Sequence, residues 1–367
     1  MSVTETTTTP EEGDLIVRSE GALGVIQLNR PRIINAITQD MVRGISTALD
    51  VFESDSSIGV VLIEGNGERG LCAGGDIRGL YNSIREGGDL GKVFWREEYI
   101  LNSRIAAFRK PYVAYMDGMV MGGGVGLAAH GRHRVLTERT QLAMPEVGIG
   151  FFPDVGGTWL LANAPGELGT YFGLTGVPMN AADALRCRLG DVIVTTARWA
   201  EARAALTRLG PDVNNGMVRG VLAHYASPKE RGPVEQHKEL IDRAFAFDTV
   251  EEILAALLDE TNDFALKTRQ TMLEKSPTSL KVTLRLLRAA RASKSLDECL
   301  IREYAAALEV FVSRDFPEGI RAAVIDKDRQ PKWSPPQVAE VTPSMVDAYF
   351  APRGADELVI PRWEGRK

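Results

Sequence analysis

Short apolar runs alternate with turn residues and amphipathic stretches along residues 14–200. Residues 15–28 read as two paired strands, and 60–63 and 112–116 are continuous apolar runs typical of buried strands. Between them lies a predicted helix, whose apolar residues recur on one helical face: Met41, Ile45, Ala48, Leu49 and Phe52. Thr38 is the expected N-cap of this helix. The alternation of strands and helices predicts a layered α/β domain.

Beyond about residue 200 the glycine and strand signals thin out, and helical spacing dominates. Four large side chains fall on one helical stripe: Leu300, Tyr304, Leu308 and Phe311. Three prolines near the end of the chain, at 331, 335 and 336, favour irregular structure there. The pattern therefore divides the chain into a disordered polar arm over 1–13, an α/β core over 14–200, a helical region over 201–340 and a tail over 341–367.

Composition and charge narrow the class of protein. A hydrophobic content of 44% is enough to bury a substantial core, so disorder is not expected for most of the chain. The 43 Lys and Arg residues are outnumbered by 49 Asp and Glu residues, and no basic run suggests a nucleic-acid partner. Three scattered cysteines, at 72, 187 and 299, fit neither a disulfide framework nor a closed zinc site, which favours a reducing compartment.

The N-terminal stretch MSVTETTTTPEEGD is polar and acidic. It has neither the apolar core of a secretory signal nor the arginines of a mitochondrial presequence. Charged residues interrupt every apolar stretch before it reaches the roughly 20 residues that cross a bilayer. We therefore expect a cytoplasmic protein without a membrane partner.

Two glycine-rich segments follow predicted strands and lead into predicted helices. The first is LCAGGDIRGL at 71–80, where Asp76 opens the helix, and the second is DGMVMGGGVGLAAH at 117–130. Backbone amides at a helix start have no internal acceptor, so they suit a developing negative charge. Glycines such as Gly74 and Gly75 let a ligand approach the backbone closely. Two such loops can supply two donors to one oxygen.

Other interpretations of these loops stay open to different degrees. Each loop alone could be a tight turn. A phosphate loop is excluded, because neither segment continues into Gly-Lys followed by Ser or Thr. A dinucleotide fingerprint is a rival, since Gly124, Gly126 and Ala129 match G-x-G-x-x-A and Glu146 lies near the expected acidic position. That acid, however, follows Pro145 and not the end of an apolar strand.

Three acidic residues are candidates for chemistry. Glu146 and Asp154 lie in the apolar segment 141–161, where desolvation would raise a carboxylate pKa and make it a base or nucleophile near neutrality. Asp154 could instead cap a turn or helix at the glycines that follow it. Glu98, in FWREEYI, sits on a predicted helix where a charged residue usually faces water.

The sequence lacks the residues that other classes of hydrolase need. With four histidines, no G-x-S-x-G and no H-E-x-x-H, the sequence supplies neither a serine triad nor a zinc hydrolase site. Cys72 beside the first glycine loop could be a nucleophile, but no histidine partner is indicated, and small buried packing explains it better. We expect no metal site.

These segments, in this order and spacing, resemble the crotonase (enoyl-CoA hydratase/isomerase) superfamily. Within it, the combination of REEY, AGGDIR, MGGGVGL, AMPE and FPDVGG looks like the thioester hydrolase branch, which acts on 3-hydroxyisobutyryl-CoA. SPTSLK at 276–281 and IDKDRQPKW at 325–333 extend the likeness almost from end to end. The resemblance implies a spiral of ββα units with a helical C-terminal region, and hydrolysis of a short acyl-CoA thioester in valine breakdown.

The resemblance also implies roles for particular residues. It maps the oxyanion-hole amides onto Gly75 and Gly123, catalytic roles onto Glu146 and Asp154, and substrate binding onto Glu98. Three neighbours in the glycine loops join the predicted substrate-binding set: Gly74, Asp76 and Gly122. The phosphates of coenzyme A need cations, for which Arg30 and Arg32 are the first candidates and Lys327 and Lys332 the next. All four cations could equally be ordinary solvated charges.

Two departures from the hydratases of this superfamily favour hydrolysis. Hydratases carry a catalytic glutamate shortly after the glycine triplet, where this chain has Gly126, and a glycine after the later proline, where it has Asp154. Adding water across a double bond needs an acid and a base over adjacent carbons, and one of that pair is missing. The alternatives are a hydratase or isomerase that uses Glu146 as its sole base, and a degenerate protein that binds acyl-CoA without turnover.

The resemblance implies no metal or redox cofactor, because coenzyme A is part of the substrate. Superfamily members often form trimers or hexamers, but the hydrolase branch need not, so a homo-oligomer is an option that the sequence leaves open. Acyl-chain specificity and the choice between nucleophile and general base for Glu146 are also left open.

Overall fold

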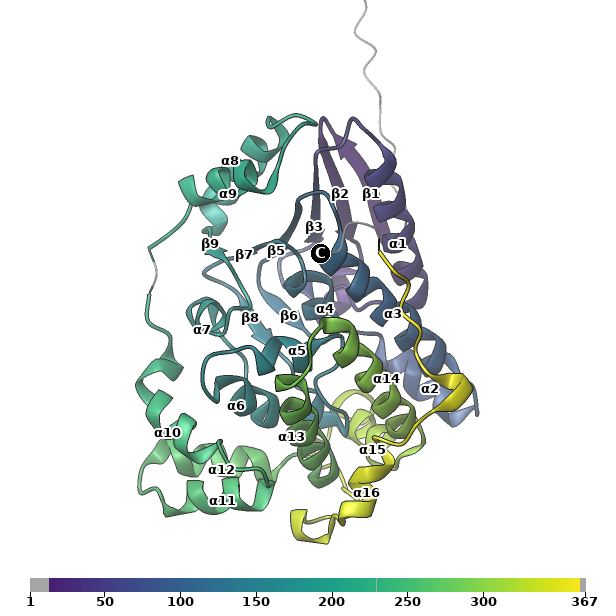
Figure 1. The fold of residues 1–367 in the computed structure, drawn as a ribbon, viewed down its shortest axis with the longest axis vertical. Helices are drawn as coiled ribbons and strands as arrows, with labels where there is room; N and C mark the ends of the chain where they lie inside the picture. Colours follow the sequence, from purple (N-terminus) through teal and green to yellow (C-terminus); the bar gives the residue numbers. More distant parts are fainter. Residues whose placement is uncertain (1–12, 229, 364–367) are drawn as a thin grey trace, which may run out of the picture.

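Two β-sheets form the centre of the molecule in the computed structural model, which describes residues 13–228 and 230–363 (Figure 1). The larger sheet contains, in spatial order, β1 (Leu15–Glu20), β2 (Leu23–Leu28), β3 (Val60–Gly65), β5 (Tyr112–Met116), β7 (His133–Leu136) and β9 (Val192–Ile193). The smaller sheet contains β4 (Gly70–Cys72), β6 (Met119–Met121) and β8 (Gln141–Ala143). β1 pairs with β2 antiparallel, and the other neighbours pair in parallel.

Consecutive strands alternate between the two sheets. β3, β5 and β7 enter the larger sheet, and each is followed by a short strand, β4, β6 or β8, in the smaller one. The chain then turns into a helix or a 3-10 turn before the next pair begins. This arrangement is the predicted spiral of ββα units, and the predicted α/β fold class is confirmed.

The larger sheet buries both faces, which explains its continuous apolar runs. Val60 and Leu62 pack in one apolar cluster with the helices α8 (Thr196–Thr207) and α9 (Asn215–His224). Val61 and Ile63, which alternate with them along the strand, belong to the main core on the other face.

Two helices of the core begin where the sequence predicts. Thr38 caps the first helix by accepting a hydrogen bond from the Met41 amide, and Asp76 caps the second by accepting from the Gly79 amide. The five residues predicted to share a face of the first helix are all buried. The core helices are α1 (Gln39–Ser54), α2 (Ile77–Arg85), α3 (Leu90–Ala107), α4 (Gly123–Ala129), α5 (Gly157–Ala162), α6 (Leu168–Thr175) and α7 (Ala181–Arg186).

Helices dominate the chain after residue 195, as predicted. They continue with α10 (Lys238–Ala244), α11 (Val250–Asp259), α12 (Asp263–Leu273), α13 (Pro277–Arg291), α14 (Leu296–Val312), α15 (Asp315–Ile320) and α16 (Pro343–Ala348). α13 packs against α5 and α6, and α14 packs against α3. The predicted stripe lies on α14, where Leu300, Tyr304 and Leu308 are buried and Phe311 packs against the core.

Within its described residues, the predicted irregular tail contains the short helix α16 and the 3-10 turn η6 (Gly354–Asp356). Thr342 caps α16, Pro343 occupies its first turn, and Val346 and Tyr349 anchor it in the core. The predicted N-terminal arm, 1–13, lies outside the described residues except for Gly13. The division into an arm, a core, a helical region and a tail stays a prediction. No helix within 13–228 and 230–363 combines the length and the apolarity needed to cross a bilayer.

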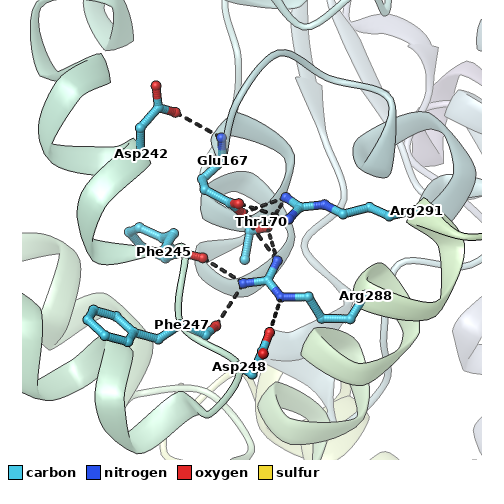
Figure 2. A network of polar contacts seen from close by, with 8 residues as sticks. All are labelled: Glu167, Thr170, Asp242, Phe245, Phe247, Asp248, Arg288 and Arg291. Atoms are coloured by element: carbon cyan, nitrogen blue, oxygen red, sulfur yellow. Dashed lines mark hydrogen bonds and ion pairs between the residues drawn. The ribbon is translucent and has the colours of Figure 1, made fainter.

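One polar network fastens the helical region to the core (Figure 2). Arg288 and Arg291 of α13 both bind the Glu167 carboxylate at the start of α6. Arg288 also donates to the carbonyls of Phe245 and Phe247, which link α10 to α11. The network therefore holds three segments together that lie far apart in the sequence.

Candidate active site

Both glycine loops open into one cavity of about 360 Å³. Its lining also includes residues of α3, of the 3-10 turn η2 (Glu146–Ile149) and of the C-terminal region. The predicted residues among the lining are Gly74, Gly75, Glu98, Gly122, Gly123, Glu146 and Asp154. The fold thus gathers seven of the ten predicted site residues around a single space.

The two glycine loops touch each other. A side-chain carbon built on Gly123 would lie 3.5 Å from the Gly75 amide nitrogen, and one built on Gly74 would lie 3.7 Å from the Gly123 amide nitrogen. Among the described residues, the amides of Gly75 and Gly123 donate no hydrogen bond outside regular elements. Gly123 begins α4, where amides lack an internal acceptor. Two neighbouring backbone donors are therefore free for a ligand oxygen.

Two carboxylates approach the second glycine loop so closely that side chains there would collide with them. A side-chain carbon on Gly122 would lie 2.8 Å from Glu146 Oε1, and one on Gly123 would lie 2.5 Å from Glu98 Oε1. Gly122 also has φ 50° and ψ −121°, a conformation that favours glycine. The geometry requires glycine at both positions.

Glu98 is buried on α3, with 2% of its surface exposed. Its Oε1 atom has no hydrogen-bond partner among the described residues. Burial raises its pKa well above the usual value, and the nearby Asp154 raises it further. Its neighbour Glu97 forms the ordinary surface ion pair, with Arg43. Its place on a predicted helix favoured a solvated Glu98, whereas the resemblance implied a role in the active site. Glu98 lines the cavity.

Glu146 begins η2 and is buried, and its Oε2 atom lacks a partner within the described chain. Burial, followed by repulsion from Asp154, raises the pKa of Glu146 well above its usual value. Burial raises the pKa of Asp154 to about 7, against the opposing effect of a hydrogen bond from Tyr99. That bond runs from the Tyr99 hydroxyl to Asp154 Oδ2 over 2.7 Å. A pKa of about 7 allows Asp154 to exchange protons near neutrality, which suits acid–base chemistry.

The alternative interpretation of Asp154 as a cap does not fit its side chain. The helix that follows, α5, has Gly156 at its N-cap, and no side-chain cap comes from that residue. The Asp154 carboxylate accepts from Tyr99, and only its backbone carbonyl accepts from the Gly157 amide. Its carboxylate is left at the cavity, where it can meet a ligand.

Three predicted substrate-binding residues lie outside the cavity lining. Asp76 caps α2 and forms an ion pair with Arg30, with 3.1 Å between Oδ2 and Nη2. Arg30 also pairs with Asp14. Arg32 is exposed on the 3-10 turn that follows β2. Their proposed contact with coenzyme A stays a prediction.

The cavity lining includes two cations that were not predicted from the sequence, Lys275 and Arg329. Lys275 is half-buried, and burial lowers its pKa. Both residues lie in or beside the two late matching segments, SPTSLK and IDKDRQPKW, which were the available signal. The predicted Lys327 and Lys332 are exposed and do not line this cavity.

The rival chemistries find little support in the described residues. Gly124 and Gly126 lie inside α4 and not in a turn before it, so no dinucleotide fingerprint forms. A side-chain carbon on Gly126 would lie 2.7 Å from Val155 Cβ, which leaves no space for a glutamate there. Burial raises the pKa of Cys72 to about 12, which suits packing and not nucleophilic attack. No cluster of His, Cys, Asp or Glu in the described part of the chain is arranged to hold a metal ion.

Comparisons with known proteins agree with this geometry. A sequence profile described as enoyl-CoA hydratase/isomerase matches residues 23–350. Curated relatives from Rattus norvegicus, Danio rerio and Homo sapiens are 39%, 40% and 39% identical to the chain and cover 95%, 92% and 94% of it. The matches span 91%, 89% and 90% of those relatives, each of which is named 3-hydroxyisobutyryl-CoA hydrolase, mitochondrial.

Two solved structures share the whole fold. A carnitinyl-CoA dehydratase from Mycobacterium thermoresistibile is 42% identical with a TM-score of 0.90, over 96% of this chain and 99% of that one. An enoyl-CoA hydratase from Rhodobacter sphaeroides 2.4.1 is 40% identical with a TM-score of 0.88, over 95% of this chain and 100% of that one. These structures are named as a dehydratase and a hydratase, whereas the curated relatives are named as hydrolases. The geometry of the site therefore has to distinguish hydration from hydrolysis.

Proposed function

This chain belongs to the enoyl-CoA hydratase/isomerase family, and from that membership we propose that it hydrolyses 3-hydroxyisobutyryl-CoA to 3-hydroxyisobutyrate and coenzyme A. The observation that carries the proposal is the meeting of three buried carboxylates with two free glycine amides in one cavity. A thioester hydrolase needs donors for the developing oxyanion and a group that attacks the carbonyl carbon or activates water. The cavity contains candidates for each.

The thioester carbonyl oxygen lies between the amides of Gly75 and Gly123. These donors stabilise the negative charge that develops on the oxygen when the carbonyl carbon becomes tetrahedral. One such donor contributes about 3 kcal/mol to transition-state stabilisation. Because both amides belong to the backbone, their placement depends on the two glycine loops and not on any side-chain rotamer.

Glu146 supplies the attack by one of two routes. As a nucleophile, its carboxylate attacks the carbonyl carbon, the carbon–sulfur bond breaks, and water later hydrolyses the resulting anhydride. As a general base, it takes a proton from a water molecule that attacks the same carbon. In both routes the departing thiolate of coenzyme A takes up a proton, which Asp154, with a pKa of about 7, can supply.

Glu98 binds the hydroxyl group of the substrate. Its buried Oε1 atom lacks a partner in the described chain and lies at Gly123, beside the proposed oxyanion site. A buried polar atom without a partner is costly, so a ligand that donates a hydrogen bond to it gains affinity. A 3-hydroxyacyl group carries such a donor, whereas an unsubstituted acyl group does not.

An aromatic wall limits the size of the acyl group. Trp95 and Phe151 stack with ring centres 5.1 Å apart, and Phe316 lies 5.2 Å from Phe151. All three line the cavity. Closely packed rings leave little freedom to accommodate a long chain, which favours a short acyl group.

The phosphates of coenzyme A bind to cations that line the cavity. Lys275 and Arg329 line the cavity, whereas Arg30 is already paired with Asp14 and Asp76. Reaching a phosphate would require Arg30 to leave those carboxylates. We therefore place Lys275 and Arg329 before Arg30 and Arg32 as phosphate ligands.

The proposed activity is tested with two substrates. Purified protein is incubated separately with 3-hydroxyisobutyryl-CoA and with crotonyl-CoA, while free thiol release and loss of the conjugated double bond are followed. The proposal predicts thiol release from the first substrate and no hydration of the second. Loss of the double bond without thiol release would contradict it.

Hydration is the second candidate function, because the two solved structures with the same fold are titled as a hydratase and a dehydratase. The crowding of Gly126 by Val155 speaks against it, since the second hydratase glutamate has no space there. A protein that only binds acyl-CoA is the non-enzymatic alternative. Binding without turnover across a panel of thioesters would support that alternative.

With this substrate, the reaction takes part in valine breakdown. The cytoplasmic location and the oligomeric state of the chain stay predictions, although the curated relatives carry the word mitochondrial in their names.

A further inference from the structure

The loop that carries Asp154 has an unusual backbone. Val155 has φ 52° and Gly156 has φ 77°, so two consecutive residues adopt the left-handed conformation. This conformation is unfavourable for a β-branched residue such as valine, and it persists only when surrounding contacts enforce it. The contacts that enforce it therefore help to determine where the Asp154 side chain points.

Glu303 of α14 binds the backbone of this loop. Its side chain is fully buried, and it accepts three hydrogen bonds from the residues that follow Asp154. Oε2 accepts from the Gly156 amide over 2.7 Å, and Oε1 accepts from the Thr158 amide over 3.1 Å and from the Thr158 hydroxyl. His130 Nε2 forms another hydrogen bond, of 2.7 Å, with the carbonyl oxygen of Val155.

The Asp154 side chain is fixed from a second direction. The Tyr99 hydroxyl donates to its carboxylate, and the Tyr99 ring packs edge-on against the ring of Tyr304, the residue next to Glu303. α3 and α14, which carry these tyrosines, pack against each other. This helix pair therefore contacts the Asp154 carboxylate through Tyr99 and the backbone shortly after Asp154 through Glu303.

We propose that Glu303 is a positioning residue, which holds the loop of Asp154 in the conformation that presents its carboxylate to the bound thioester. The proposal rests on the proposed function of Asp154 in thioester cleavage. Glu303 does not line the cavity, so it acts through the loop and not by touching the substrate.

Capping the start of α5 does not by itself require a buried glutamate from a distant helix. Helix starts are usually capped by a serine, threonine or aspartate close in sequence, whereas Glu303 lies 147 residues from Gly156. A fully buried carboxylate destabilises the fold, and burial raises the pKa of Glu303 to about 8 despite its three donors. A carboxylate that destabilises the fold at this position is explained if the site requires it to hold the loop of Asp154.

The test compares Glu303→Gln with the wild type in thiol release from 3-hydroxyisobutyryl-CoA. Glutamine keeps the shape of the side chain, but its NH₂ group faces backbone donors, so the loop relaxes. We expect kcat to fall by between about 10-fold and about 100-fold, with KM changed by less than about 2-fold, since small displacements of reacting groups have effects of this size. In an Asp154→Asn background, Glu303→Gln should produce no further fall in kcat.

Two sets of variants separate positioning from stability. Asp183→Asn is the matched control, because Asp183 is also a buried carboxylate that accepts from a backbone amide, that of Val234, but lies outside the cavity lining. It should lower the thermal midpoint and leave kcat unchanged. If Glu303→Gln does not fold, Thr158→Val and Thr158→Ser replace it. The valine variant should lose kcat, and the serine variant, which keeps the hydroxyl donor, should retain it.

Each result decides the proposal. Unchanged kcat in Glu303→Gln, or a fall that persists in the Asp154→Asn background, overturns the positioning role while the proposed function stands. Equal kcat in the Thr158→Val and Thr158→Ser variants does the same. A wild type that releases no thiol overturns the proposed function itself, and the positioning role then falls with it.

Discussion

Gly122 occupies a backbone conformation that alanine does not adopt without strain, and it faces the Glu146 carboxylate. In Gly122→Ala, the new methyl group would lie 2.8 Å from Glu146 Oε1 and shift either that carboxylate or the Gly123 amide. We expect kcat for thiol release to fall by about 100-fold or more, the usual effect of losing one oxyanion donor. Steady-state kinetics of the purified variant measure this change.

Gly220→Ala is the matched control for this variant. Gly220 lies within α9, where an added side-chain carbon meets no atom within 4 Å. We expect unchanged kcat and a gain of up to about 1 kcal/mol in the free energy of unfolding, because alanine is the better helix former. Equal losses of activity in both variants would contradict the proposed function of the glycine loop.

Of the two proposed phosphate ligands in the cavity lining, Lys275 is half-buried and Arg329 is exposed. Lys275→Ala should raise KM for 3-hydroxyisobutyryl-CoA by about 10-fold, the effect of losing roughly 1.4 kcal/mol of charge-assisted binding. Lys267→Ala, which removes an exposed lysine of α12, should leave KM unchanged. A KM for Lys275→Ala equal to that of the wild type would remove this residue from the binding site.

Individual residues were predicted unevenly. Gly123 and Glu146 lie in short local motifs, from which the resemblance predicted them as site residues, and both line the cavity. Lys275 and Glu303 were missed, because the folding that brings them to the cavity and to the loop after Asp154 joins positions far apart in the sequence. In the sequence, Glu303 looks like any charged residue of an amphipathic helix.

Elements were predicted where they are long enough to show a period. β5 begins and ends at the predicted residues, and α1 buries the predicted face. The three strands of the smaller sheet were not recognised, because three residues are too few to display alternation. These strands form because β6 pairs with β4 and with β8, which lie in other turns of the spiral. The order of apolar and polar residues within one short strand does not predict this pairing.

The attachment of the helical region is testable at the scale of elements (Figure 2). Arg288→Ala removes the hydrogen bonds to the carbonyls of Phe245 and Phe247 and the ion pair with Glu167. Because these acceptors lose a partly buried partner, we expect the free energy of unfolding to fall by about 2 kcal/mol. Urea unfolding measures this change. Arg243→Ala, which breaks an exposed pair with Glu260, should cost less than about 1 kcal/mol.

At the scale of the whole molecule, the site joins both halves of the chain. The core contributes the glycine loops and the buried carboxylates that line the cavity, and the helical region contributes Lys275 and Phe316 to the same lining. Glu303 of the helical region binds the loop that follows Asp154. Four carboxyl groups consequently lie buried close to one another: Glu98, Glu146, Asp154 and Glu303. The folded protein holds protons on these groups at a pH where the unfolded chain has lost them.

This difference in bound protons determines whether the stability of the fold rises or falls with pH. Because the folded pKa values of Asp154 and Glu303, about 7 and about 8, exceed their usual values, stability is lost as the pH rises through them. The lowered pKa of His133 acts in the opposite direction only below about pH 6.5, where unfolded histidine takes up a proton.

We therefore expect the urea midpoint to fall between about pH 7 and about pH 8.5. In Glu303→Gln the fall should be shallower, because one of the titrating groups is absent. A midpoint that stays constant or rises over this interval would contradict the raised pKa values of the buried carboxyl groups.

The central claim is that Glu146 acts on a thioester held at the two glycine amides, and Glu146→Gln tests it most directly. Single-turnover thiol release from 3-hydroxyisobutyryl-CoA is measured beside substrate affinity by calorimetry. The account predicts that the variant binds the substrate with a Kd within about 3-fold of the wild type, since less than roughly 1 kcal/mol of binding is lost, and releases no detectable thiol. Thiol release at the wild-type rate by this variant would contradict the account.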